Sequence, residues 1–177
     1  MEKQNNNLSI KEQIVCNSEV LSKMNPVDEI SYAPFEGKTF SEIYEMLLDI
    51  FLKIGYKVER QNFGTIIIDD NRIYSSLRYV LTEAEFAAYL SLSKILKQGI
   101  IIGSHKNHKG RNYETITIAA PVIIDGKRGN IAAVVKRTTK NYYKTHRVIF
   151  VDDSIMKLAM NNKKENLATA ADAMPLP

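Results

Sequence analysis

The sequence predicts an α+β fold in which N-terminal helices pack on a four-stranded antiparallel β-meander. Apolar residues recur at helical spacing in the first half, and the hydrophobic period changes from 3.6 to 2 after Gly99. The pair Asp125-Gly126 is the typical signal of a two-residue β-hairpin and joins two of the alternating segments. A chain of 177 residues suits one domain with its own core.

The start of the chain is expected to be a flexible or weakly ordered lead-in. Residues 1–38 are polar, and Pro26 and Pro34 interrupt any long element, which leaves room for one short helix at 11–23. Residues 39–152 form the single α+β domain. Residues 153–177 are polar or rich in Ala, Met and Pro, so we expect a poorly ordered tail.

Capping signatures define the two main helices. Thr39 followed by Glu42, and Thr82 followed by Glu85, are capping boxes that open helices ending near Gly55 and Gly99. Between them we expect two short strands and a helix, at 56–60, 65–69 and 70–79.

The second half supplies the meander. Alternating apolar and polar residues predict four strands, at 99–104, 112–121, 131–138 and 146–152. The residues between consecutive strands of an up-and-down sheet gather at its two ends. We therefore expect the segments before the second strand and around the connection of the third and fourth to lie at the same end.

Composition narrows the class of protein. No apolar run approaches the roughly 18 residues of a membrane span, and the N-terminus shows no signal-peptide core. The single cysteine, Cys16, forbids an internal disulfide and any multi-cysteine metal site, although a catalytic Cys–His pair stays formally open. The glycines form neither a Walker loop nor a dinucleotide fingerprint.

Positive charge is concentrated in one block. Residues 99–147 carry ten Lys and Arg against two acids, Glu114 and Asp125, a net of +8. Residues 1–98 carry eleven against fourteen, a net of −3. Such a block repels itself, and a polyanionic ligand relieves the repulsion. A lysine-rich solvated surface is the alternative, but all three histidines fall in the same block.

Three clusters in this block carry possible chemistry. The members are His105, Lys106, His108, Lys109, Arg111 and Tyr113 in the first, Lys136, Arg137 and Thr138 in the second, and Tyr143, Lys144, His146 and Arg147 in the third. Histidine can serve as base and acid near neutrality, and Lys and Arg hold phosphate oxygens. Tyr and Thr hydroxyls can donate to the same oxygens, and Tyr rings can stack on bases. This combination is what RNA cleavage without a metal requires.

The segment HKNHKGRNYETITIAAPVIIDGKRGNIAAVVKRTTKNYYKTHRVIF resembles the C-terminal toxin domain of phage MuF-type head-associated proteins. That domain is grouped with the barnase/EndoU/colicin/RelE-like (BECR-fold) nucleases. The similarity covers roughly residues 35–152. It implies helices on a four-stranded antiparallel sheet, a metal-independent endoribonuclease and a toxin with a cognate immunity protein. Carried over by position, the polar positions of the pattern match His105, Arg111, Lys136, Thr138, Tyr143 and His146.

We therefore expect an endoribonuclease toxin that acts in the bacterial cytoplasm after delivery from a phage particle or a secretion system. Its substrate is tRNA or another structured RNA, cleaved by 2′-hydroxyl attack with no metal or cofactor. His105 and His146 are the candidate proton-transfer pair, with His108 as a substitute for His105. Arg111 and Lys136 hold the phosphate, and Thr138 and Tyr143 donate hydroxyl hydrogen bonds. Further RNA contacts are expected from Lys106, Lys109, Tyr113, Arg137, Lys144 and Arg147.

Three alternatives stay open. A non-catalytic RNA-binding module shares the charged block, and only an activity assay separates it from a nuclease. An ADP-ribosyltransferase needs a glutamate, for which Glu114 is the candidate in the sheet half. A zinc protein could use His105, His108 and His146 as ligands.

Overall fold

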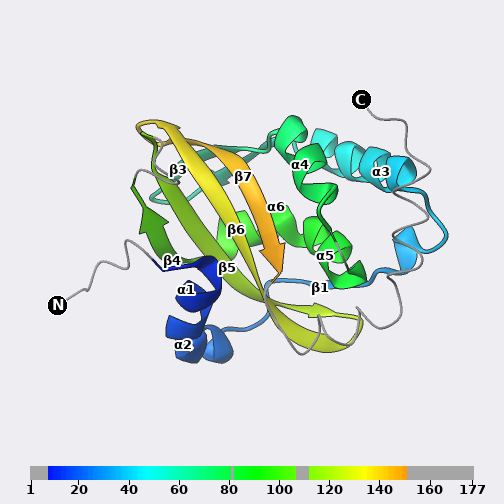
Figure 1. Cartoon of the computed structure of the whole chain (residues 1–177), viewed down its shortest axis with the longest axis horizontal. Coiled ribbons are helices and arrows are strands. Elements are labelled where there is room, and N and C mark those ends of the chain that lie inside the picture. The colour runs from blue at the N-terminus through cyan, green and yellow to red at the C-terminus, as the bar shows by residue number, and fades with distance from the viewer. Residues whose placement is uncertain (1–7, 81, 107–111, 151–177) are drawn as a thin grey trace.

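The computed structural model describes residues 8–80, 82–106 and 112–150. These residues form a curled mixed sheet with helices packed on it (Figure 1). The strands are β1 (Glu29–Ile30), β2 (Lys57–Arg60), β3 (Gly64–Ile67), β4 (Ile100–His105), β5 (Thr115–Ile124), β6 (Lys127–Thr139) and β7 (Tyr142–Phe150). Their order is β1-β5-β6-β7-β3-β2, and β4 also pairs with β5.

The α+β class is confirmed, but the four-stranded antiparallel meander is only part of the sheet. Strands β4 to β7 form that meander, joined between β5 and β6 by the expected turn at Asp125-Gly126, where both residues have positive φ. Strand β3 adds to β7 in parallel and brings β2 with it, and β1 adds to β5 in parallel. Alternation in the sequence does not reveal these additions, because their partners lie far away along the chain.

Helices α3 (Phe40–Lys53) and α5 (Glu83–Ala88) begin where the two capping signatures predict. The other helices are α1 (Ile10–Cys16), α2 (Ser18–Lys23), α4 (Asp70–Leu77) and α6 (Leu92–Gln98), with 3-10 turns η1 (Ala33–Phe35) and η2 (Tyr89–Ser91). The hydroxyls of Thr39 and Thr82 accept hydrogen bonds from the amides of Glu42 and Glu85. The helix expected from residue 82 to residue 97 is divided by η2 into α5 and α6.

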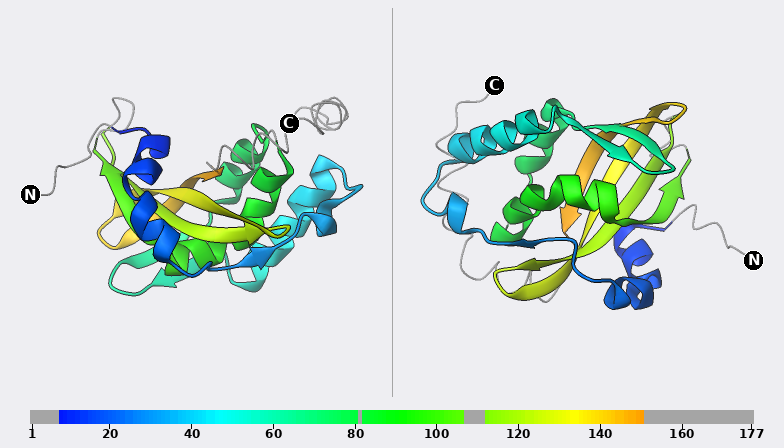
Figure 2. Two further views of the ribbon diagram at one scale, coloured as in Figure 1. Left: turned by 90° about the horizontal axis from the view of Figure 1, so that it is seen from below. Right: turned by 180° about the vertical axis from the view of Figure 1, so that it is seen from behind.

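The main core lies on the inner face of the curl. Helix α6 contacts β2, β5 and β6, and Figure 2 shows it on the side of the sheet opposite α1 and α2. Alternate residues of β5, namely Ile116, Ile118, Ala120 and Val122, are buried in this core with side chains of α3 to α6. The inner face of the sheet therefore forms the hydrophobic core of the domain.

Helices α1 and α2 cover one end of the outer face. Ile14 and Leu21 are buried with Ala119 and Ala132, two small residues that let the helices approach the sheet closely. The guanidinium of Arg128 donates to the carbonyls of Leu21 and Met24, at 2.9 and 2.7 Å, and so caps α2.

Residues 1–38 were expected to be flexible or weakly ordered, and the described part, residues 8–38, differs from that expectation. They form α1, α2, β1 and η1 and pack on the rest of the domain. The expected tail, 153–177, lies outside the described residues.

Candidate functional site

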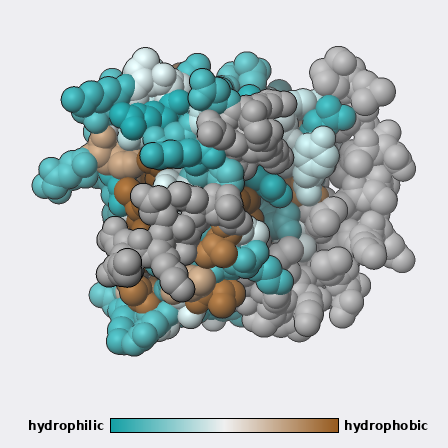
Figure 3. Space-filling view, turned by 60° about the vertical axis from the view of Figure 1, so that its left-hand side comes forward, coloured by the Kyte–Doolittle hydropathy of each residue, from teal (hydrophilic) through white to brown (hydrophobic). Residues whose placement is uncertain are grey.

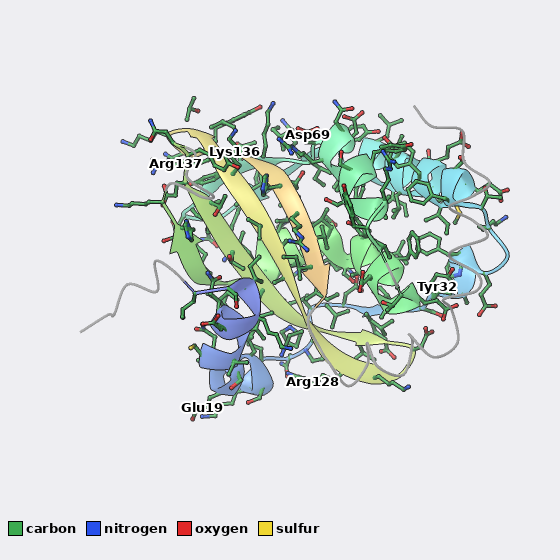
Figure 4. All side chains as sticks on the ribbon, viewed as in Figure 1. Glu19, Tyr32, Asp69, Arg128, Lys136 and Arg137 are labelled. Atoms are coloured by element: carbon green, nitrogen blue, oxygen red, sulfur yellow. The ribbon has the colours of Figure 1, made fainter. Side chains whose placement is uncertain are left out.

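Polar residues of the three sequence clusters meet at one end of the outer face. In the register of the sheet His105 lies beside Thr115, Thr115 beside Lys136, and Lys136 beside Lys144. Side chains of residues paired in this way point to the same face. Lys136 is labelled at this end of β6 in Figure 4. The expectation that His105, Lys136 and Lys144 lie at one end of the sheet is therefore met.

His146 joins this face through an irregularity in β7. The pairing of β6 with β7 shifts between Val134 and Val135, where Val134 lies beside Arg147 and Val135 beside Thr145. His146 is the extra residue of that β-bulge. Strict alternation would place it on the inner side with Val148. The bulge instead lets its ring meet Tyr113 of the outer face.

Tyr113 contacts two of the candidate reacting groups. The Nζ atom of Lys136 lies 4.2 Å from the centre of the Tyr113 ring, a cation–π distance. The ring of His146 meets Tyr113 edge to face, with centroids 6.1 Å apart and planes at 62°. All three side chains are half-buried, and the Nδ1 atoms of His105 and His146 are shielded from solvent. Tyr113 thus links Lys136 and His146, with the Lys136 ammonium over one face of its ring.

The outer face concentrates positive charge here. Lys136 and Lys144 lie directly opposite each other, an arrangement that destabilises a sheet. Arg147 lies on the same face and is exposed. Within the described residues no carboxylate forms an ion pair with any of these three cations. Figure 3 shows mainly hydrophilic residues over the upper part of its view, at the height of the β6–β7 turn. The site is therefore suited to an anion.

Arg137 points away from this cluster. It lies beside Tyr143 in the register, on the opposite face from Lys136. Its Nη1 donates to Glu114 Oε2 at 3.2 Å, and its backbone amide donates to the carbonyl of Glu114. This pair lengthens the β5–β6 ladder and neutralises both charges. Arg137 and Glu114 thus form a structural ion pair.

Two of the expected hydroxyl donors lie elsewhere. Tyr143 is buried in the inner core and stacks on Phe63, with ring centroids 4.1 Å apart. The hydroxyl of Thr138 donates to the carbonyl of Tyr142 at 3.0 Å, which commits its one proton to the turn. The pairing shifts between Arg137 and Thr139, so Thr138 is itself at an irregularity that alternation does not predict.

Of the site residues expected between positions 106 and 111, the structure describes only Lys106. His108, Lys109 and Arg111 lie outside the described residues, and Lys106 is exposed at the end of β4. The described ranges hold no group of three or more His, Cys, Asp or Glu placed to bind a metal ion. In the same ranges, no helix has both the length and the apolar character needed to cross a membrane.

Comparison of the chain with protein-family models, curated proteins and solved structures finds no match. The geometry of the outer face therefore carries the functional inference.

Proposed function

We propose that the protein is a metal-independent endoribonuclease that cleaves RNA by attack of a 2′-hydroxyl on the adjacent phosphorus. The observation that carries the proposal is the gathering of His105, Lys136 and His146, from three different strands, at one end of one face. The resemblance to phage MuF-type toxin domains points to the same chemistry.

In this proposal the scissile phosphate lies over Thr115 and Lys136, between the two imidazoles. His105 and His146 belong to strands three spacings apart, roughly 14 Å between backbones. One imidazole takes the proton of the 2′-hydroxyl while the other protonates the departing 5′-oxygen. The phosphorus–O5′ bond breaks and a 2′,3′-cyclic phosphate forms.

The cations act on charge that develops during the reaction. Negative charge grows on the phosphate oxygens as the pentacovalent phosphorane forms, and ammonium groups fixed beforehand stabilise it without reorganisation. The Tyr113 ring holds the ammonium of Lys136 in place. Lys144 and Arg147 supply further positive charge at the same end.

The biological role follows from the resemblance. We propose a toxin that cuts tRNA or another structured RNA in the bacterial cytoplasm, delivered from a phage particle or a secretion system and held in check by a cognate immunity protein. A non-catalytic RNA-binding module is the competing function, because the opposed Lys136 and Lys144 favour any bound polyanion. Activity separates the two.

The test is incubation of total bacterial RNA with the purified chain in EDTA. Wild type is expected to give discrete fragments. His146→Ala should lower the rate about 100-fold or more, the usual contribution of a general acid or base. Lys127→Ala is the matched control, because Lys127 is an exposed cation at the opposite end of β6. Intact RNA at high protein concentration, or equal cleavage by His146→Ala, contradicts the proposal.

A further inference from the structure

The basic row of the candidate site continues beyond β7. Lys144 lies beside Ile67 of β3, and Ile67 lies beside Lys57 of β2. Lys57 is exposed and therefore shares the outer face with Lys136 and Lys144. From Lys136 to Lys57 the row spans three strand spacings, roughly 14 Å. This is far enough to hold more than one phosphate of an extended strand.

A second row of residues, Tyr142, Thr65 and Glu59, runs beside the first on the same face. Along β7 it lies two residues nearer the β6–β7 turn. Tyr142 lies beside Thr65, and Thr65 lies beside Glu59. Tyr142 and Lys144 are two positions apart along β7, with only Tyr143 between them, so both side chains are on the outer face. The Tyr142 side chain is 39% exposed. An aromatic ring therefore stands in solvent beside the cationic row.

The carboxylate of Glu59 is oriented by its neighbour. The hydroxyl of Thr65 donates to Glu59 at 3.0 Å to Oε1 and 2.8 Å to Oε2. A fixed, exposed carboxylate repels phosphate but accepts hydrogen bonds from the amino and ring N–H groups of a base. The first row thus presents cations that suit phosphates. The second presents a carboxylate that can accept hydrogen bonds from a nucleic-acid base.

We propose that these two rows form a subsite for the nucleotides next to the cleaved bond, in an unpaired RNA strand that crosses β7, β3 and β2. Lys57 and Lys144 hold backbone phosphates, one base stacks on Tyr142, and Glu59 accepts from the edge of the next base. A paired strand keeps its bases inside the duplex, so it offers neither a free ring face nor a free edge. The inference rests on the proposed function and places the cleaved bond in an unpaired segment of the RNA, such as a loop of a structured RNA.

The test is equilibrium binding of a fully 2′-O-methylated oligonucleotide, which lacks the attacking hydroxyl and cannot be cleaved. Fluorescence anisotropy compares the single strand with the same strand annealed to its complement. The single strand should bind at least tenfold more tightly. Tyr142→Ala should weaken that binding about fivefold or more, and Tyr142→Phe should restore it, because the ring is retained.

Salt dependence separates the charged contact from the stacked one. Lys57→Ala should lower the slope of log K against log salt by about 0.7, the value for one phosphate on a single strand. Tyr142→Ala should leave that slope unchanged. Glu59→Gln should change the preference among oligonucleotides of different base composition. Lys127→Ala and Tyr79→Ala are the controls, because both residues are exposed and lie outside the two rows.

Failure of the subsite and failure of the nuclease are distinguishable. If the duplex binds as tightly as the single strand, or if Lys57→Ala and Tyr142→Ala behave like the controls, the subsite is wrong even when RNA is cleaved. If the binding pattern holds and wild type cleaves no RNA, the subsite stands and the nuclease proposal fails. Thermal unfolding of each variant checks that the fold is retained.

Discussion

At the scale of single residues, the lysine pair in the outer face shows a conflict between folding and binding. Lys136 and Lys144 are direct neighbours on adjacent strands, where like charges reduce the stability of a sheet. Hydrophobic packing gives no reason for two ammonium groups at these positions. In the proposed function a bound phosphate supplies the reason, because it would offset the repulsion when substrate is present.

Lys144→Glu should therefore stabilise the free protein while weakening RNA binding. It replaces a repulsive cross-strand pair with an attractive one, which is worth about 0.5–1 kcal/mol at low salt. Urea unfolding measures the first effect, and binding of 2′-O-methyl RNA at the same salt measures the second. Lys144→Gln is the control and should lie between wild type and Lys144→Glu in both. A variant that loses stability, or that binds RNA like wild type, contradicts this account.

At the scale of elements, local signals in the sequence predict helix starts and tight turns but not the pairing of distant strands. Thr39, Thr82 and Asp125-Gly126 act through neighbours a few residues away, and they predicted helix starts and a hairpin correctly. Strand β3 pairs with β7, which lies more than 70 residues later in the chain, and no local pattern in the sequence encodes this pairing.

The same limit explains the errors in the predicted site. The convergence of His105, Lys136 and Lys144 could be predicted from strand order alone. The faces of His146 and Thr138 depend on irregularities in the β6–β7 pairing, and the two-residue period contains no sign of them. Tyr142 and Tyr143 are adjacent and lie on opposite faces of the sheet. Stacking on Phe63 places Tyr143 on the inner face.

Gly64 is the element-scale test, because it lets β3 approach the β6–β7 turn. Its φ is +142°, and an added Cβ would lie 2.2 Å from the carbonyl oxygen of Asn141. Gly64→Ala should cost about 3 kcal/mol through backbone strain and the displaced contact. Urea unfolding measures this cost. Gly126→Ala, where φ is also positive but an added Cβ meets nothing within 4 Å, is the control and should cost less. Equal costs at the two positions would show that the approach of Asn141 is not the cause.

At the scale of the whole molecule, the curled sheet separates stability from chemistry. The inner face is filled by α3 to α6, and α1 and α2 cover one end of the outer face. The polar end of the outer face holds His105, Lys136 and His146. Among the described cations of residues 99–147, Lys136, Lys144 and Arg147 lie on this face. A rigid sheet can fix reacting groups from several strands, which is what catalysis by positioned imidazoles and cations requires.

The central claim is that these groups hold one phosphodiester and use its neighbouring 2′-hydroxyl. A single-stranded DNA oligonucleotide that contains one ribonucleotide tests it most directly. In EDTA, wild type should cut only after the ribonucleotide, leaving a 2′,3′-cyclic phosphate and a 5′-hydroxyl, and His146→Ala should leave the oligonucleotide intact. Cleavage at deoxynucleotides, products with 3′-hydroxyl ends, or no cleavage by wild type would contradict the account.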